Sequence, residues 1–484
     1  MNTELRNEEV NPQNKMKRIA SLDFLRGLAI WMMVFLHVFN HKYDYSWVFD
    51  VGIENIFSHT NGFFAGFILF SGFFGNWIGI FILISGIVNT ISFVKRVSRG
   101  TTTAKVFLKQ ILTGIGILAA GFITESFGYY GYFGTVIKSG EMFSASTWTE
   151  PAIVDRITSQ IFRMEALQII GWCMIVIAIY LFFLMRNGGH KKVKRNLIVT
   201  ASFIVILAIA TPFVWWGSEK INWAVHPSFE GYDTIWPSMR LQYYNWRRGS
   251  YFMMVLSGDF YPLFPFLMTS LVGVCFGLAL SMEKPPKRLP LWGLIAFFVL
   301  LSIGVLFMVL GFMEVLPKPF LGFDVSFERP TYAFYFLLLA FQVGLVTLML
   351  RLVEYNGKSQ KFGNNFLVKY LRTWGTISLS IFALQIYHLV PYAIFGTAFP
   401  SVDVLGGKFT PETEWWILLL AFVTILFYDL LIWLWGRINF FLSFEWMIIK
   451  LTNMATKEKS IDRLNHKKIL NEIEWMDYKE LSGR

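Results

Sequence analysis

The chain is 484 residues long, 55% hydrophobic and 15% charged, and its mean hydropathy is +0.50. Apolar runs of about 20 residues recur along it, which is the length of a helix that spans a bilayer. This composition excludes an ordinary soluble enzyme. The net charge of +11 does not indicate a nucleic-acid-binding protein, because the basic residues lie in short loops between apolar runs.

Ten apolar segments are predicted to be membrane-spanning helices, so we expect an all-α polytopic membrane protein with the lipid bilayer as a partner. In chain order the segments cover about residues 22–40, a run ending near 94, 108–127, 160–184, 197–216, 261–281, 291–314, 331–352, 374–397 and 414–435. They form one predicted transmembrane domain, residues 21–450. An N-terminal tail (residues 1–20) and a charged C-terminal tail (residues 451–484) flank it.

Basic clusters lie at alternate ends of these segments, at residues 15–18, 95–99, 186–195, 284–288 and 358–372. Loops rich in Lys and Arg stay in the cytoplasm during membrane insertion. We therefore predict a multi-pass protein with an even number of spans and both termini in the cytoplasm. The tail from about residue 456 carries charges of both signs and is predicted to be solvated.

Two stretches depart from simple spans. Residues 62–94 are too long for one span and carry five glycines in their first half, which predicts a broken or re-entrant piece followed by a full helix. Residues 437–450 mix aromatic side chains with Asn439 and Glu445. This mixture predicts a short helix lying in the inner membrane interface.

Ionisable side chains in the first segment are candidates for function, because such groups are costly inside a bilayer. Arg26 and His37 are eleven residues apart, so they lie within about 20° of one helix face and about 16 Å apart. Asp23 can pair with Arg26, or both can simply anchor the helix end. His37, followed by Asn40 and His41, can take and return a proton in acid–base or nucleophilic catalysis. A neighbouring helix could equally satisfy this histidine.

Later segments add polar candidates. Gln168 either faces a site or hydrogen-bonds to another helix. Asp259 precedes a predicted helix and can act as its cap. Gln385 and His388 are three residues apart and could share a side that faces a cavity. Both cysteines lie within apolar segments, and we expect no metal site.

The motifs resemble a known superfamily. Residues 21–27, with Arg26 followed after ten residues by His37, resemble the first catalytic helix of the transmembrane acyltransferase superfamily. The arginine–histidine spacing is similar to the acyltransferase-three branch, which modifies sugars and cell-surface glycans. Residues 81–86 and 163–170 are closer to the heparan-alpha-glucosaminide N-acetyltransferase branch. Residues 261–266 and 444–446 resemble elements of an uncharacterised bacterial relative.

The resemblance implies an enzyme that moves an acyl group, typically acetyl, from cytoplasmic acyl-CoA to a hydroxyl or amine of a sugar or glycan at the outer side. Acyl-CoA, typically acetyl-CoA, is then a co-substrate, and no bound cofactor is expected. Its phosphates would meet Arg26 and the basic loops. The candidate binding residues are Asp23, Arg26, Asn40, His41, Arg163, Gln168, Asp259 and His388.

The sequence leaves the catalytic histidine open between His37 and His59. In the heparan branch this histidine lies in a loop after the first span, followed shortly by Trp-Asn-Gly. Here His59 is followed by Asn61 and Gly62 without the tryptophan. Around Gln168 the branch signature is displaced, so its acyl-CoA contacts do not transfer securely to Arg163.

A solute or lipid transporter is the alternative from another class. Its signature is a pair of broken helices near the membrane midplane. In the sequence only the 62–94 run qualifies, and no internal repeat is evident. The acceptor and the oligomeric state also stay open, and a homodimer is one assembly we consider.

Overall fold

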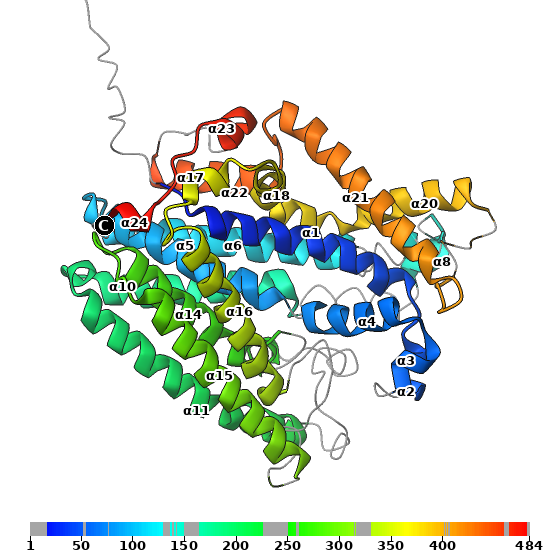
Figure 1. Cartoon of the computed structure of the whole chain (residues 1–484), viewed down its shortest axis with the longest axis horizontal. Coiled ribbons are helices and arrows are strands. Elements are labelled where there is room, and N and C mark those ends of the chain that lie inside the picture. The colour runs from blue at the N-terminus through cyan, green and yellow to red at the C-terminus, as the bar shows by residue number, and fades with distance from the viewer. Residues whose placement is uncertain are drawn as a thin grey trace, which may run out of the picture.

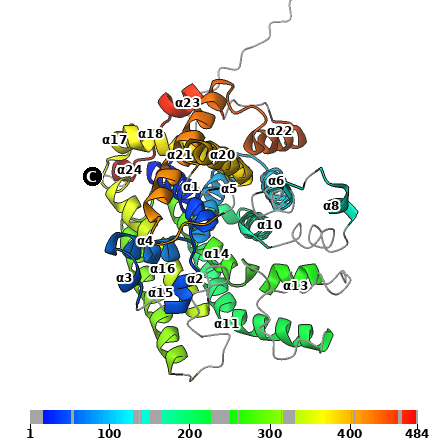
Figure 2. The same cartoon turned by 90° about the vertical axis from the view of Figure 1, so that its right-hand side faces the viewer.

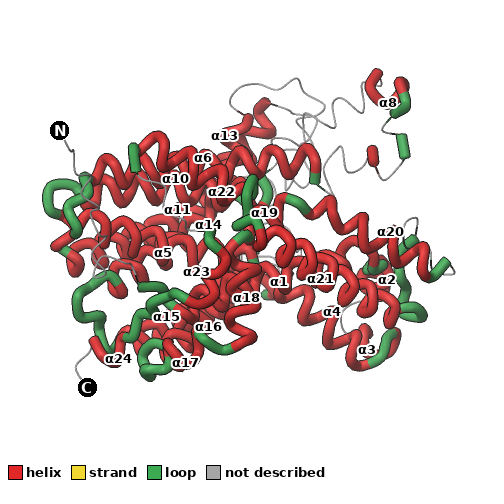
Figure 3. Tube along the Cα trace, turned by 90° about the horizontal axis from the view of Figure 1, so that it is seen from above, coloured by secondary structure: helices red, strands yellow, loops and turns green. Residues whose placement is uncertain are grey.

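The computed structural model describes residues 17–51, 55–75, 77–128, 136–137, 140–141, 143–149, 164–225, 250–257, 261–313, 315, 331–400, 402, 404, 407–458 and 464–481. Every regular element among these residues is a helix (Figure 3). Two isolated β-bridges join Arg18 to Trp475 and Tyr43 to Phe409. The all-α prediction is confirmed over the described part of the chain.

Nine helices in the described residues are long and apolar enough to cross a membrane. They are α1 (Ala20–Lys42), α5 (Ile78–Ser98), α6 (Thr103–Phe127), α10 (Ala166–Met185), α11 (Val193–Val225), α14 (Leu263–Leu280), α15 (Leu289–Phe312), α16 (Tyr332–Leu352) and α21 (Glu414–Arg437). They correspond to nine of the ten predicted spans, because an apolar run of this length is best satisfied as a helix in lipid. The chain is thus a multi-pass membrane protein.

The ninth predicted span, residues 374–397, is not one continuous helix, so the prediction of an unbroken helix there was wrong. The region is divided into α18 (Phe366–Thr376), α19 (Ser378–Ala383), the 3-10 turn η5 (Gln385–His388) and α20 (Leu389–Ala398). Pro391 explains the last break, because a proline ring clashes with the carbonyl four residues earlier, here that of Tyr387.

A helix break also lies within the 62–94 run, as predicted. Helix α4 (Gly62–Gly75) ends before α5 begins at Ile78. A re-entrant path for α4 stays a prediction. Each half of the chain therefore carries a discontinuous helix, which corrects the expectation that the 62–94 run is the only one.

Shorter helices complete the described fold. They are α2 (Ser46–Val51), α3 (Ile56–His59), α8 (Ala145–Thr149), η3 (Gly189–Lys191), α13 (Ser250–Ser257), α17 (Ser359–Gly363), α22 (Phe444–Thr456), α23 (His466–Asn471) and α24 (Tyr478–Leu481). Helix α22 is the short helix predicted after the last span, and it packs against α6. Its place in the membrane interface stays a prediction.

Buried side chains form two large apolar cores. One joins α5, α10, α14 and α16, and the other joins α1, α4, α20 and α21. In Figures 1 and 2, α14, α15 and α16 lie on one side of α1, and α20 and α21 lie on the other. Helices α5 and α14 approach closely through glycines. A Cβ on Gly86 would lie 2.4 Å from the Ser270 carbonyl oxygen, so a small residue is required at this crossing.

The C-terminal segment packs against the membrane domain. The Arg18 N–H donates to the Glu474 carbonyl at 2.9 Å, and the Met476 N–H donates to the Arg18 carbonyl at 2.8 Å. Trp475 and Tyr478 are 6% and 1% exposed. The prediction of a solvated tail was wrong here, because apolar side chains spaced among the charges find a surface to bury against. The residues just before α1 and the C-terminal segment therefore lie side by side, and the predicted even number of spans stays a prediction.

Candidate functional site

Arg26 connects α1 to the discontinuous segment, at the end of α1 that the loop charges predict to be cytoplasmic. Its Nε donates to Ser378 Oγ at 3.2 Å. Next to it, the Glu445 carboxylate of α22 accepts from the Leu379 N–H at 2.7 Å and from Ser380 Oγ at 2.5 Å. Glu445 therefore caps the first turn of α19 and attracts Arg26 electrostatically. The half-buried Arg26 is therefore hydrogen-bonded within the protein, and its role as an anchor at the membrane surface stays a prediction.

Asp23 has a partner other than the predicted one. Arg18 Nε lies 2.8 Å from Asp23 Oδ2, and a second guanidinium nitrogen donates to Oδ1 at 3.0 Å. Arg26 is directed toward Ser378 instead. The predicted pair of Asp23 with Arg26 is thus replaced by a pair nearer the helix start, and Asp23 serves the N-terminal end of α1.

A carboxylate that we did not predict lies on α21, where it faces α18. Asp429 of α21 accepts from Trp374 Nε1 at 2.9 Å and from the Tyr370 hydroxyl at 3.1 Å. The Tyr370 hydroxyl in turn accepts from Trp31 Nε1 of α1 at 3.0 Å. A lone acid within a long apolar run was the sequence signal for this group. The network ties α1, α18 and α21 together.

His37 has the geometry of a proton acceptor. Its Nδ1 lies 2.7 Å from the Met33 carbonyl oxygen. Because a carbonyl only accepts hydrogen bonds, Nδ1 must carry the hydrogen of the neutral ring, and the lone pair on Nε2 is left available. The side chain is half-buried. His37 therefore combines a defined tautomer with partial access.

Two more histidines lie beside it. His41 Nδ1 is 3.0 Å from the Tyr392 hydroxyl, and His388 Nδ1 is 3.0 Å from the Tyr428 hydroxyl. The ring centroids of His37 and His41 are 5.8 Å apart, and those of His41 and His388 are 5.2 Å apart. We call His37, His41, His388, Tyr392 and Tyr428 the histidine cluster. Three imidazoles thus lie close together, of which His37 is half-buried and His388 is fully buried.

The break in the ninth predicted span places His388 in the histidine cluster. His388 Nδ1 lies 2.8 Å from the Gln385 carbonyl oxygen within η5, and the Tyr428 hydroxyl donates to the Leu384 carbonyl at 3.2 Å. The 3-10 turn frees backbone carbonyls, and nearby side chains satisfy them. Irregular backbone at membrane depth needs such cover, and short 3-10 stretches within helices often mark functional positions.

The remaining candidate catalytic residue, His59, lies elsewhere. It is exposed on α3, where its Nδ1 is 3.2 Å from the Asn55 carbonyl oxygen and its ring stacks on Trp47 at 6.2 Å. None of its hydrogen bonds or ring contacts among the described residues reaches the histidine cluster. Asn40 is also exposed on α1. The structure groups His37 with His41 and His388 and leaves His59 and Asn40 apart.

The two residues that follow His59 in the sequence contact a buried carboxylate. Glu414, 4% exposed at the start of α21, accepts from Thr60 Oγ1 at 2.5 Å and from the Asn61 side-chain amide. We did not predict Glu414, because an acid at a helix start usually reads as a solvated cap. The contact holds the segment after α3 against α21.

The other predicted binding residues do not join the histidine cluster. Gln168 is fully buried in α10, in the other apolar core, and its amide makes no hydrogen bond to a described residue. A Cβ on Gly121 of α6 would lie 3.0 Å from it. Arg163 and Asp259 lie outside the described residues.

No protein-family model matches the sequence, and a comparison with curated proteins finds no matching relative. The resemblance to the acyltransferase superfamily thus rests on its short motifs. Within the described ranges, no three side chains of the His, Cys, Asp and Glu types lie close enough to hold a metal ion.

Proposed function

We propose that this protein is a membrane-embedded acyltransferase that moves an acyl group, typically acetyl, from cytoplasmic acyl-CoA to a hydroxyl or amine of a sugar or glycan at the outer side. The observation that carries the proposal is the state of His37, whose Nδ1 is committed to the Met33 carbonyl while its Nε2 is available as a base. Arg26 on the same helix is a fixed cation about 16 Å away.

The proposed division of labour follows the axis of α1. Arg26, held by Ser378 and Glu445, supplies a positive charge for the phosphates of the acyl donor at the predicted cytoplasmic end. His37 lies toward the other end, where an acceptor would arrive. One helix then serves both substrates, and the neighbouring polar groups restrict how its side chains can turn.

The proposed reaction is a direct transfer assisted by a base. Nε2 of His37 takes the proton of the acceptor hydroxyl or amine as the acceptor atom bonds to the thioester carbonyl carbon. The tetrahedral intermediate then breaks its carbon–sulfur bond, and the CoA thiolate takes the proton back from the imidazolium. The products are the acylated acceptor and free CoA, and His37 is neutral again.

Proteoliposomes supplied with radiolabelled acetyl-CoA and a panel of glycan acceptors test this proposal. We expect His37→Ala to lower the transfer rate by about 10²- to 10⁴-fold, the usual contribution of a general base. His190→Ala, in the loop turn η3, is the matched control and is expected to retain activity.

His59→Ala decides between the two candidate histidines. Retained activity in this variant, together with loss in His37→Ala, supports the role of His37. Full activity in a folded His37→Ala protein would remove His37 from catalysis. Loss in His59→Ala alone would assign the reaction to the loop histidine.

A transporter of solutes or lipids is the second candidate function. It is favoured by the two discontinuous helices, since α4 and the α19–η5–α20 segment both pack on α1. Gln385 of η5, for example, donates to Met33 Sδ of α1 at 3.3 Å. Broken helices that meet at one element are a feature of many transporter sites.

Uptake by the same proteoliposomes in the absence of acetyl-CoA separates the two functions. A transporter accumulates a labelled sugar or moves a labelled lipid without acyl donor. The acyltransferase proposal expects no such movement and expects labelled product only when acetyl-CoA is present.

A further inference from the structure

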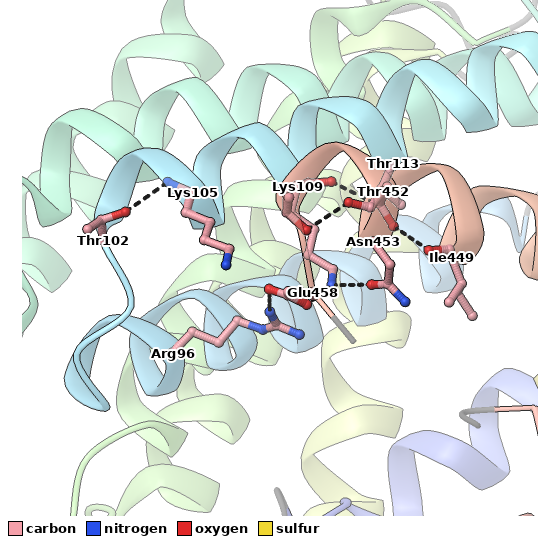
Figure 4. A network of polar contacts seen from close by, with 10 residues as sticks. Arg96, Thr102, Lys105, Lys109, Thr113, Ile449, Thr452, Asn453 and Glu458 are labelled. Carbon is pink, nitrogen blue, oxygen red and sulfur yellow. Dashed lines mark hydrogen bonds and ion pairs between the residues drawn. The ribbon is translucent and has the colours of Figure 1, made fainter. Parts of the chain in front are cut away.

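A second polar centre lies where α5, α6 and α22 meet, away from the histidine cluster. Arg96 donates to Glu458 Oε1 at 3.1 Å, and Lys109 Nζ lies 2.5 Å from Glu458 Oε2 (Figure 4). The side chains of Arg96, Lys109 and Glu458 are 15%, 12% and 23% exposed, in that order. One carboxylate is thus held between two cations at the edge of the protein.

The backbone at the end of α22 positions this carboxylate. Lys457 adopts a left-handed conformation with φ of 51°, and the Glu458 N–H donates to the Asn453 carbonyl at 3.0 Å. This is the hydrogen bond of a helix-ending turn. Lys109 Nζ also donates to Asn453 Oδ1 at 2.9 Å. The cations are therefore preorganised around a fixed point.

Positive charge exceeds the charge that Glu458 supplies. Lys105 extends from α6 toward Glu458 in Figure 4 and interacts with it electrostatically. The ion pairs of Arg96 and Lys109 both end on this one carboxylate. Burial disfavours its charge, but the hydrogen bond from Lys109 and the nearby cations outweigh burial, and the pKa of Glu458 lies below its usual value.

Exposed apolar side chains border the same cations. Leu108 precedes Lys109 on α6 and is 42% exposed. Leu451 and Met454 on α22, on either side of Asn453, are 62% and 67% exposed. An anionic phospholipid presents a phosphate next to acyl chains, and this edge presents cations next to apolar surface.

We propose that Arg96, Lys105 and Lys109 form a binding site for the headgroup phosphate of an anionic phospholipid, and that Glu458 is the internal anion with which the phosphate competes. The basic ends of α5 and α6 place the site in the cytoplasmic leaflet under the predicted topology. The proposal is independent of acyl transfer.

Lipid retention by the full-length protein tests it. The protein is placed in phosphatidylcholine nanodiscs with and without phosphatidic acid, and bound lipid is measured by native mass spectrometry. Arg96→Gln/Lys109→Gln is expected to weaken phosphatidic acid binding by about 10- to 30-fold, from the usual attraction per basic residue. Lys191→Gln/Lys192→Gln removes the same charge from an exposed loop and is expected to change binding less than twofold.

Two further variants keep the test decisive if the double variant fails to fold. Lys105→Gln removes a side chain that donates no hydrogen bond in Figure 4, and is expected to weaken binding about fivefold. Glu458→Gln vacates the site and is expected to strengthen binding about fivefold. A purely structural cluster would not bind more lipid after this change.

Three results would overturn the proposal. The first is unchanged or weaker binding in Glu458→Gln. The second is an equal loss in the loop control, which would show general attraction to basic loops. The third is stabilisation by inorganic phosphate in phosphatidylcholine nanodiscs that matches the effect of phosphatidic acid, because the site would then take a soluble phosphate.

Discussion

At His37, one hydrogen bond decides which ring nitrogen can act as a base. The Met33 carbonyl is only four residues away on the same helix, so α1 itself sets the tautomer. For Asp429 of α21, by contrast, the hydrogen-bond partners are not on its own helix. Its partners Tyr370 and Trp374 come from another helix, and together they stabilise a carboxylate that an apolar environment would otherwise exclude.

The Tyr370 hydroxyl provides a test of that network. Tyr370→Phe removes the bond that the hydroxyl donates to the Asp429 carboxylate and the bond that it accepts from Trp31. We expect it to lower the free energy of unfolding by about 3 kcal/mol, about 2 kcal/mol of it from the bond to the charged group. Tyr180→Phe removes a neutral bond to Thr200 and is expected to cost about 1 kcal/mol. Denaturant unfolding in detergent micelles measures both variants. Equal losses would show that Asp429 is not a charged acceptor.

At the scale of elements, glycines and breaks set how closely α1 meets its neighbours. A Cβ on Gly27 would lie 2.0 Å from the Leu371 carbonyl oxygen of α18. The glycine after Arg26 thus allows the contact that brings Arg26 near Ser378. The break before α20 has a comparable role, because it turns His388 toward His41.

Replacing Gly27 by alanine is expected to push α1 away from α18. Gly27→Ala should lower the free energy of unfolding by about 2 kcal/mol, since the blocking atom belongs to backbone and cannot move aside cheaply. Gly66→Ala is the matched control, because nothing lies within 4 Å of a Cβ at this helical position. The control should be neutral or stabilising by up to about 1 kcal/mol. A thermal melt in detergent distinguishes them, and a harmless Gly27→Ala would contradict the packing argument.

At the scale of the whole molecule, the two ends of the chain are joined through one buried acid. Glu354 accepts from the Ser21 N–H at 2.9 Å and from Ser21 Oγ at 2.7 Å, and its carbonyl accepts from the Tyr478 N–H at 3.2 Å. Burial raises the pKa of Glu354 from 4.5 to about 7, against the opposing effect of the Ser21 hydrogen bonds. The start of α1, the end of α16 and the C-terminal segment therefore share one titrating group.

This group predicts a pH dependence of stability. Its folded pKa lies above the unfolded value, so its contribution is fully present below about pH 4.5 and is lost as the pH rises to about 7, by about 3 kcal/mol. Glu354→Gln, which imitates the protonated acid, should remove that part of the slope. The exposed Glu472→Gln should retain it. Melting temperatures between pH 4.5 and 8 provide the measurement, and an unchanged slope in Glu354→Gln would contradict the assignment.

The sequence by itself determined most of the membrane-spanning helices, and it predicts one topology for them. Apolar runs of bilayer length must form helices because their backbone groups have no other partners in lipid, and the basic loops predict the direction. Nine of the ten expected spans follow this logic. The sequence also predicts that Arg26 and His37 share one face of α1, since this depends only on the helical repeat.

Only the tertiary structure decided which polar groups meet. His41 and Tyr392 are 351 residues apart in the chain, and Ser21 and Glu354 are 333 apart. No local pattern encodes such a pairing, because it depends on how the helices pack. The same reason explains why the predictions for the C-terminal tail and for an unbroken span at residues 374–397 were wrong. The tail buries Trp475 only because α17 and α18 offer a surface, and the segment from Ser378 breaks where Glu445 and Tyr428 satisfy its freed backbone groups.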